Sequence, residues 1–182
     1  MSDRESPPEL LAPREALARE VARLEEMINP DSAWEQLEIR LLPTPEPATS
    51  AELTPVLNAF LSELGLSTLG PDWREAGWRE LTHEEALRLL TYLLAESMAY
   101  HEPRREPSNA RESALAFLSL FGPASRLLTN SDLHTALPPD GSRPRASFGY
   151  AMGRGLTQAT FEGGIVAVGA GRIGLLWSTD ED

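Results

Sequence analysis

The sequence predicts an α+β domain in which several helices pack on an antiparallel sheet that a C-terminal β-hairpin completes. Apolar residues recur at helical spacing over much of the chain before Gly122. Short apolar runs of strand length follow, and only glycine-containing turn residues separate the last two runs, GIVAVG and RIGLLWS. A chain of 182 residues, 41% of them hydrophobic, is also long enough to bury one sizeable core.

An amphipathic helix is expected from Pro13 to about Ile28, since proline suits the first turn of a helix. Three apolar side chains share one face with Ile28: Leu17, Val21 and Leu24. This apolar stripe is narrow, and the sequence NPD follows it. We therefore expect residues 1–30 to form a helical arm that packs peripherally or forms a homodimer with a second copy. Residues 31–182 are expected to form a single α+β domain.

A half-buried strand is expected in EQLEIRLLP, where apolar and charged residues alternate. The apolar positions are Leu37, Ile39 and Leu41. The proline-rich stretch PTPEPATS then predicts a loop. Thr54 and the following Pro55 predict the start of a short helix that ends before Gly65.

Two further helices are predicted from their capping residues. Thr82 and Glu85 have the spacing of a capping box and open a helix that is apolar around most of its circumference. Asn109 and Glu112 have the same spacing and predict a helix that Gly122 stops. The polar stretch HEPRREPSN between them has the length of a connection in an antiparallel helix pair.

Two tryptophans, Trp73 and Trp78, lie in the stretch WREAGWRE. Its tripeptide repeats after five residues, which is too short a period for a repeat architecture. We expect both tryptophans to anchor a loop against the core.

The last third of the chain supplies the remaining strands. SRLLTN predicts a short strand, and residues 138–155 predict a long polar loop. In the C-terminal hairpin, Ile165 and Ala167 are expected on one face and Val166 and Val168 on the other, with Ile173, Leu175 and Trp177 opposite to Leu176. Because both faces are apolar, the hairpin should be covered on both sides or lie centrally in the sheet.

Charge and composition exclude several classes of function. Arginine supplies all 16 basic residues against 28 acidic ones, which gives a net charge of −12 and disfavours nucleic acid as a partner. A basic protein partner is favoured instead. The absence of cysteine excludes disulfides, thiolate metal sites and cysteine nucleophiles. The N-terminus lacks the apolar region of a signal peptide, and no run of 18 apolar residues occurs, so we expect a cytoplasmic protein without a membrane segment.

No motif predicts catalysis or the binding of a cofactor or metal, so we expect a protein that is not an enzyme. His83, His101 and His134 lack metal-ligand spacing and are interpreted as solvated or capping residues. No serine lies in a G-x-S-x-G motif. The glycines of GGIVAVGAGRIG lie between strands with no helix after them, so they predict a turn rather than a phosphate cradle.

The acidic C-terminal tail is one candidate for binding a partner. Asp180, Glu181 and Asp182 follow the last strand, close to Trp177. Carboxylates at the end of a strand can form a metal or acid/base site, and as exposed charges they can bind a cationic partner. A charged end that keeps a sheet edge soluble is the commoner role.

A group of arginines is the second candidate. Arg143, Arg145 and Arg154 surround Phe148 and Tyr150 in the long polar loop. Such a group can hold an anion by bidentate contacts and stacking. A solvated loop is the interpretation that we weigh more heavily.

The acidic helices, together with the segments RLLTN, TFEGGIVAVG and LLWSTDED, resemble uncharacterised cytoplasmic proteins of high-GC bacteria. In build the chain is also similar to the immunity proteins of bacterial toxin systems. The resemblance covers mainly residues 126–182 and carries no catalytic motif. It implies a small acidic protein that binds a toxin and has no active site.

We therefore expect a non-catalytic protein that binds another protein, most concretely an immunity protein whose acidic surface blocks the basic cleft of a toxin such as a nuclease. Two alternatives remain open. One is a structural or adaptor component of a bacterial assembly that docks through its N-terminal helix. The other is an enzyme on small molecules that uses the C-terminal carboxylates or the loop from Arg143 to Arg154.

Overall fold

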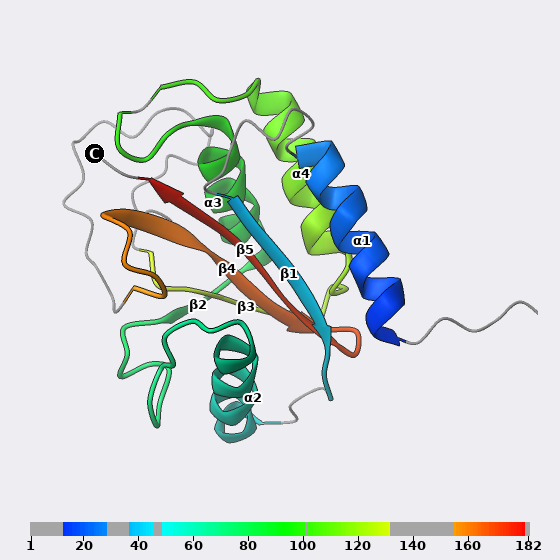
Figure 1. The fold of residues 1–182 in the computed structure, drawn as a ribbon, viewed down its shortest axis with the longest axis vertical. Coiled ribbons are helices and arrows are strands. Elements are labelled where there is room, and N and C mark those ends of the chain that lie inside the picture. Colours follow the sequence, from blue (N-terminus) through cyan, green and yellow to red (C-terminus); the bar gives the residue numbers. More distant parts are fainter. Residues whose placement is uncertain (1–12, 29–36, 46–48, 101, 132–154, 181–182) are drawn as a thin grey trace, which may run out of the picture.

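The computed structural model of the protein describes residues 13–28, 37–45, 49–100, 102–131 and 155–180. In this part of the chain four helices accompany one sheet of five strands, which confirms the predicted α+β class (Figure 1). The helices are α1 (Pro13–Ile28), α2 (Ser50–Glu63), α3 (His83–Ala95) and α4 (Pro107–Ser119). The strands are β1 (Leu37–Pro43), β2 (Arg79–Leu81), β3 (Arg126–Thr129), β4 (Phe161–Gly169) and β5 (Arg172–Asp180).

The sheet has the strand order β1-β5-β4-β3-β2, and each neighbouring pair is antiparallel. β4 and β5 form the expected hairpin and lie inside the sheet, between β3 and β1. Their two-residue turn has positive φ at both positions, 50° at Ala170 and 71° at Gly171. This combination matches the right-handed twist of paired strands.

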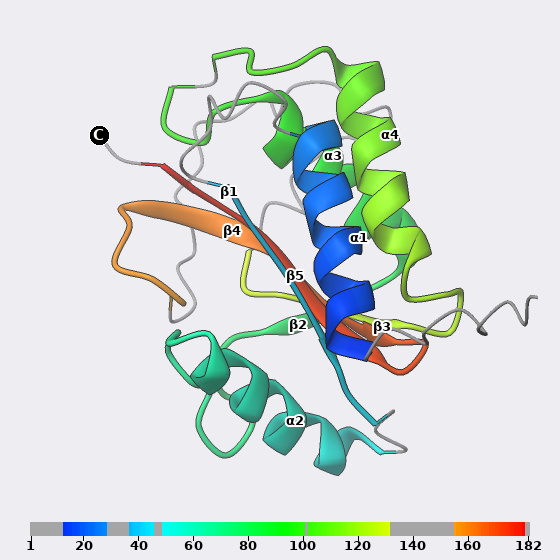
Figure 2. The same cartoon turned by 45° about the vertical axis from the view of Figure 1, so that its right-hand side comes forward.

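Helices cover both faces of the sheet (Figures 1 and 2). α1, α3 and α4 lie on one face, and α2 lies on the other. The hairpin side chains divide between two hydrophobic clusters as predicted. Ile165, Ala167 and Leu176 belong to the cluster under α1, α3 and α4, and Val166, Val168, Ile173, Leu175 and Trp177 belong to the cluster under α2.

Trp73, Trp78 and Trp177 lie in the core on the α2 face. Trp73 and Trp78 are each 2% exposed, which confirms that they anchor their loop. Trp78 stacks on Trp177 with 5.7 Å between ring centroids. Gly164 makes room for this stack, because a Cβ at that position would lie 2.6 Å from the Trp177 ring.

Two of the predicted helix starts are wrong. The N-cap of α2 is Thr49, which forms a capping box with Glu52, so the predicted cap Thr54 lies inside the helix and is buried. α4 begins at Pro107 without a side-chain cap, and the predicted cap Asn109 lies in its first turn. Proline has the φ of a first helical residue, and this local preference prevails over the capping spacing of Asn109.

The capping box of Thr82 and Glu85 is present as predicted and opens α3. This helix packs against α4, and most of its apolar residues are buried in the hydrophobic cluster between α1, α3, α4 and the sheet.

α1 packs against β1 and α4. Its buried side chains Leu17, Leu24 and Ile28 belong to the same hydrophobic cluster as Ile39 and Leu41 of β1. The helix therefore contributes to the core on this face, and a truncation at residue 31 tests the arm that the sequence predicts over residues 1–30. None of the described helices is long and apolar enough to cross a membrane.

Candidate functional site

The structure describes one of the six residues that the sequence singled out for partner binding. Asp180 ends β5 and is only 5% exposed, so its carboxylate lies inside the protein. The other five lie outside the described residues: Glu181, Asp182, Arg143, Arg145 and Arg154.

Asp180 is buried because the segment between α3 and α4 surrounds it. We call this segment, residues 96–106, of which the structure describes all but residue 101, the α3–α4 connection. Four groups of the connection donate hydrogen bonds to the Asp180 carboxylate: the Ser97 hydroxyl at 3.1 Å, the Met98 N–H at 2.6 Å, the Ala99 N–H at 3.4 Å and the Arg104 guanidinium. A charge-assisted network of this kind satisfies a buried carboxylate that would otherwise be costly to desolvate.

Arg104 contacts two positions of β5. It pairs with Asp180 and donates a hydrogen bond of 3.2 Å to the Ser178 hydroxyl. Residues two apart in a strand point to the same face, so one guanidinium reaches both side chains. Its side chain is 14% exposed.

Backbone hydrogen bonds close the connection on itself. Glu96 and Pro103 form an antiparallel bridge, and the Ser97 N–H donates to the Glu102 carbonyl at 2.9 Å. The Arg104 N–H donates to the Ala95 carbonyl at 2.7 Å. The segment is thus a compact, internally bonded loop.

Arg105 ties the same loop to neighbouring helices. Its guanidinium donates to the Ser113 hydroxyl of α4 at 2.9 Å and to the Met27 carbonyl near the end of α1. The connection is therefore anchored by Arg104 to the sheet and by Arg105 to two helices.

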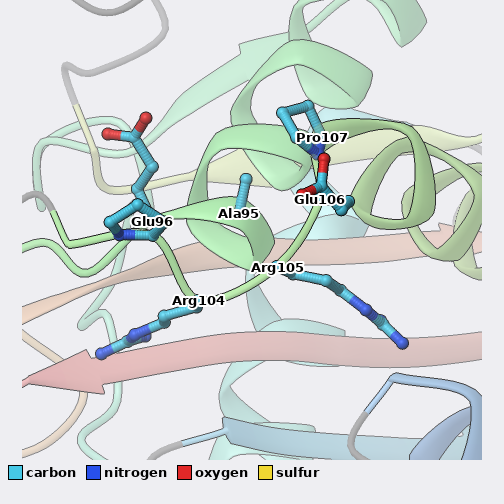
Figure 3. A pocket seen from close by; sticks show the side chains of 7 residues that line it. Ala95, Glu96, Arg104, Arg105, Glu106 and Pro107 are labelled. Atoms are coloured by element: carbon cyan, nitrogen blue, oxygen red, sulfur yellow. The ribbon is translucent and has the colours of Figure 1, made fainter.

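A cavity of about 450 Å³ lies at the base of the connection (Figure 3). In Figure 3 the side chains of Arg104 and Arg105 extend in opposite directions from the connection. The lining residues are Ala95, Glu96, Pro103, Arg104, Arg105, Glu106 and Pro107. Since both guanidinium groups have partners in the protein, the charges that the connection leaves open to solvent are carboxylates.

Tyr100 lies at the tip of the connection and is 60% exposed. Its backbone N–H donates to the Ser97 hydroxyl at 3.2 Å, so the residue that holds Asp180 also holds the backbone at Tyr100. Among the described residues, the large hydrophobic side chains that are exposed are Tyr100 and Leu115. Glu102 and Glu106 are exposed on the same connection.

A second hollow, of about 330 Å³, lies between β1 and α2. Most of its lining is apolar, and Glu63 is the charged residue on its wall. Glu63 pairs with Arg14 of α1 at 3.1 Å. This hollow is lined by fewer charged side chains than the connection carries.

The clearest electrostatic perturbation lies at the opposite edge of the sheet. Arg126 donates two hydrogen bonds, of 2.8 and 2.7 Å, to the Glu80 carboxylate. These bonds lower the pKa of Glu80 below its ordinary value of 4.5, while partial burial acts in the opposite direction. The same bonds raise the pKa of Arg126.

No group of three or more metal-ligating side chains occurs within the described ranges. His83 lies beside the Gly122 carbonyl at 3.3 Å and the Ser125 hydroxyl at 3.1 Å, and its exposed ring agrees with the predicted capping or solvated role. His101 and His134 lie outside the described residues.

The sequence reasoning missed the connection as a site and treated HEPRREPSN only as a polar link. A signal was present in its adjacent arginines, Arg104 and Arg105, because paired cations are unusual in so acidic a chain. The exposure of Tyr100 had no signal, since a single tyrosine in a polar stretch has no periodic pattern.

Comparison with known proteins found no match: no family model fits the chain, and no curated protein or solved structure is similar to it.

Proposed function

We propose that this chain is a non-catalytic protein that binds a basic protein partner through the α3–α4 connection, and that it acts as an immunity protein that neutralises a bacterial toxin. The observation that carries the proposal is Tyr100, a 60% exposed aromatic residue on a loop that buried hydrogen bonds hold in place.

Tyrosine is enriched among the residues that dominate binding energy, because it offers a large contact area with few rotatable bonds. A loop that is ordered before binding also loses less conformational entropy when a partner docks. Both conditions are met at Tyr100, whose backbone is bonded to Ser97.

The charge around Tyr100 favours a cationic partner. Glu102 and Glu106 are exposed on the same loop, and Arg104 and Arg105 direct their guanidinium groups into the protein. The whole chain has a net charge of −12. Complementary charge of this kind speeds association and rejects partners of like charge.

The test uses the full chain as bait in extracts of its native host, with two variants compared. Tyr100→Ala removes the proposed anchor, and Leu115→Ala removes the other exposed large hydrophobic side chain, which lies on α4. We expect a specific partner to bind the parent and Leu115→Ala, and to bind Tyr100→Ala at least tenfold more weakly, which is about 1.4 kcal/mol or more.

Equal binding by both variants would show that the connection is not part of the interface.

A second experiment tests the immunity role. The captured partner, expressed alone, should harm cells, and expression of the parent chain with it should restore growth. A harmless partner would favour the adaptor role over the immunity role.

A further inference from the structure

We infer that the α3–α4 connection is a carboxylate-binding loop, and that Asp180 fills it in cis as a latch that sets the conformation of the connection. The binding loop stands on geometry alone. Its consequence for partner binding at Tyr100 rests on the proposed function.

The donor set is that of an anion site. One carboxylate oxygen of Asp180 accepts hydrogen bonds from the Ser97 hydroxyl and the Met98 N–H, and the other lies against the Arg104 guanidinium. A backbone N–H, a hydroxyl and a guanidinium together satisfy both oxygens. We call these three groups the carboxylate cradle.

The cradle is buried and built from one short segment. Ser97 is 7% exposed and Met98 is 1% exposed, so their donors are shielded from water when the loop has this conformation. All three donors lie within the α3–α4 connection, whereas the carboxylate comes from a strand 76 to 83 residues later in the chain. The carboxylate is thus a ligand of the loop, held there by the chain.

Removal of the carboxylate should release the loop. Without Asp180 the Ser97 hydroxyl and the Met98 N–H would lose the carboxylate that accepts their hydrogen bonds, and the Arg104 guanidinium would lose its ion-pair partner and keep the Ser178 hydroxyl. Loss of these buried bonds favours an opened conformation. The Ser97 hydroxyl also accepts the Tyr100 N–H at 3.2 Å, so an opened loop would no longer fix the Tyr100 backbone. The latch therefore connects the end of the last strand to the proposed binding surface.

The test replaces the side-chain carboxylate with a free one. Asp180→Ala in the full chain should lower Tm by roughly 6–15 °C, as expected for one partner removed from a buried ion pair. Formate has the size of the group that is lost. At 100 mM, and with a Kd of about 10 mM, it should raise the Tm of Asp180→Ala by about 3–5 °C beyond the effect of equal sodium chloride.

Two controls define the result. The parent should gain nothing from formate beyond the salt effect, because Asp180 fills the cradle. Asp180→Ala combined with Arg104→Met should also gain nothing, because the cation of the cradle is missing. An equal gain in all three proteins would overturn the inference.

A measurement on the parent keeps the inference testable if Asp180→Ala fails to fold. In hydrogen exchange, the Met98 amide should exchange at least a hundredfold more slowly than the amides of exposed turns, although it lies in a loop. Fast exchange at Met98 would show that the latch does not hold.

The two proposals fail separately. If formate has no specific effect but Tyr100→Ala abolishes partner binding, the latch is wrong and the proposed function stands. If formate restores Asp180→Ala while Tyr100→Ala binds normally, the cradle stands and the interface lies elsewhere.

Discussion

Trp177 is buried to 1% exposure and stacks on Trp78 on the α2 face of the sheet. Trp177→Ala should destabilise the protein by about 3–5 kcal/mol, because it removes a large buried side chain and leaves a cavity. At this chain length the loss corresponds to a fall in Tm of roughly 10 °C, measured by calorimetry. Leu115→Ala is the control and should stay within about 0.5 kcal/mol of the parent, since Leu115 is 47% exposed. A Trp177 variant that melts within a degree or two of the parent would contradict the packing.

The Glu80–Arg126 pair makes stability depend on pH. Because the folded pKa of Glu80 is lowered, the pair stabilises the protein above the unfolded pKa and loses this effect as pH falls through the folded pKa. Glu80→Gln should therefore cost up to about 1 kcal/mol at pH 7, a modest value because the Glu80 side chain is 39% exposed. The variant and the parent should converge as pH falls through the lowered folded pKa of Glu80.

The measurement is urea unfolding of the parent and Glu80→Gln between pH 3 and pH 7. Glu75→Gln is the matched control, since Glu75 is an exposed glutamate in the segment that precedes β2. A constant difference between parent and Glu80→Gln across this range would show that the ion pair is not its origin.

Among the helices, the packing of α1 bears on whether residues 1–30 form a separable arm. Three of its side chains are buried in the main cluster: Leu17, Leu24 and Ile28. Their burial contributes roughly 5–9 kcal/mol in total, which is comparable with the stability of a whole domain. We expect a chain that starts at residue 31 to lose cooperative melting.

Point variants give the same comparison without a truncation. Ile28→Ala should cost about 2–5 kcal/mol, whereas Arg23→Ala on the exposed side of α1 should cost less than about 0.5 kcal/mol. If the truncated chain melts cooperatively near the parent temperature, residues 1–30 are the separate arm that the narrow apolar stripe suggests.

At the scale of the whole molecule, the net charge of −12 should steer a basic partner. The association rate should fall about tenfold or more between low salt and 1 M salt, because the Debye length shrinks to about 3 Å. Glu102→Gln with Glu106→Gln should slow association at low salt. Glu15→Gln with Glu26→Gln changes the charge equally on α1 and is the control, measured by stopped-flow kinetics with the recovered partner.

The tail acids are tested in the same way. Glu181→Gln with Asp182→Asn leaves Asp180 in place, because that carboxylate is part of the core. Slower association with an unchanged Tm would give the tail a steering role. An unchanged rate at every salt concentration would show that the tail has no steering role.

Features that depend on near neighbours along the chain could be predicted from residue types and spacings. The two faces of β4 and β5, the capping box at Thr82 and the buried tryptophans follow from residue types and short spacings, and the structure has each of them. Side-chain direction alternates along a strand, so a linear sequence contains it. The capping spacing at Thr82 is equally local, whereas the same spacing at Asn109 did not mark a helix start, because Pro107 begins α4.

The role of Asp180 and the exposure of Tyr100 depend on contacts that the folded chain makes between distant segments. In the sequence Asp180 is one of three consecutive acids, yet its donors lie 76 and 83 residues earlier, at Arg104 and Ser97. Its burial depends on which segment the end of β5 meets, and Tyr100 is exposed because the same segment folds around that carboxylate. Such contacts join distant parts of the chain, and no local period or spacing encodes them.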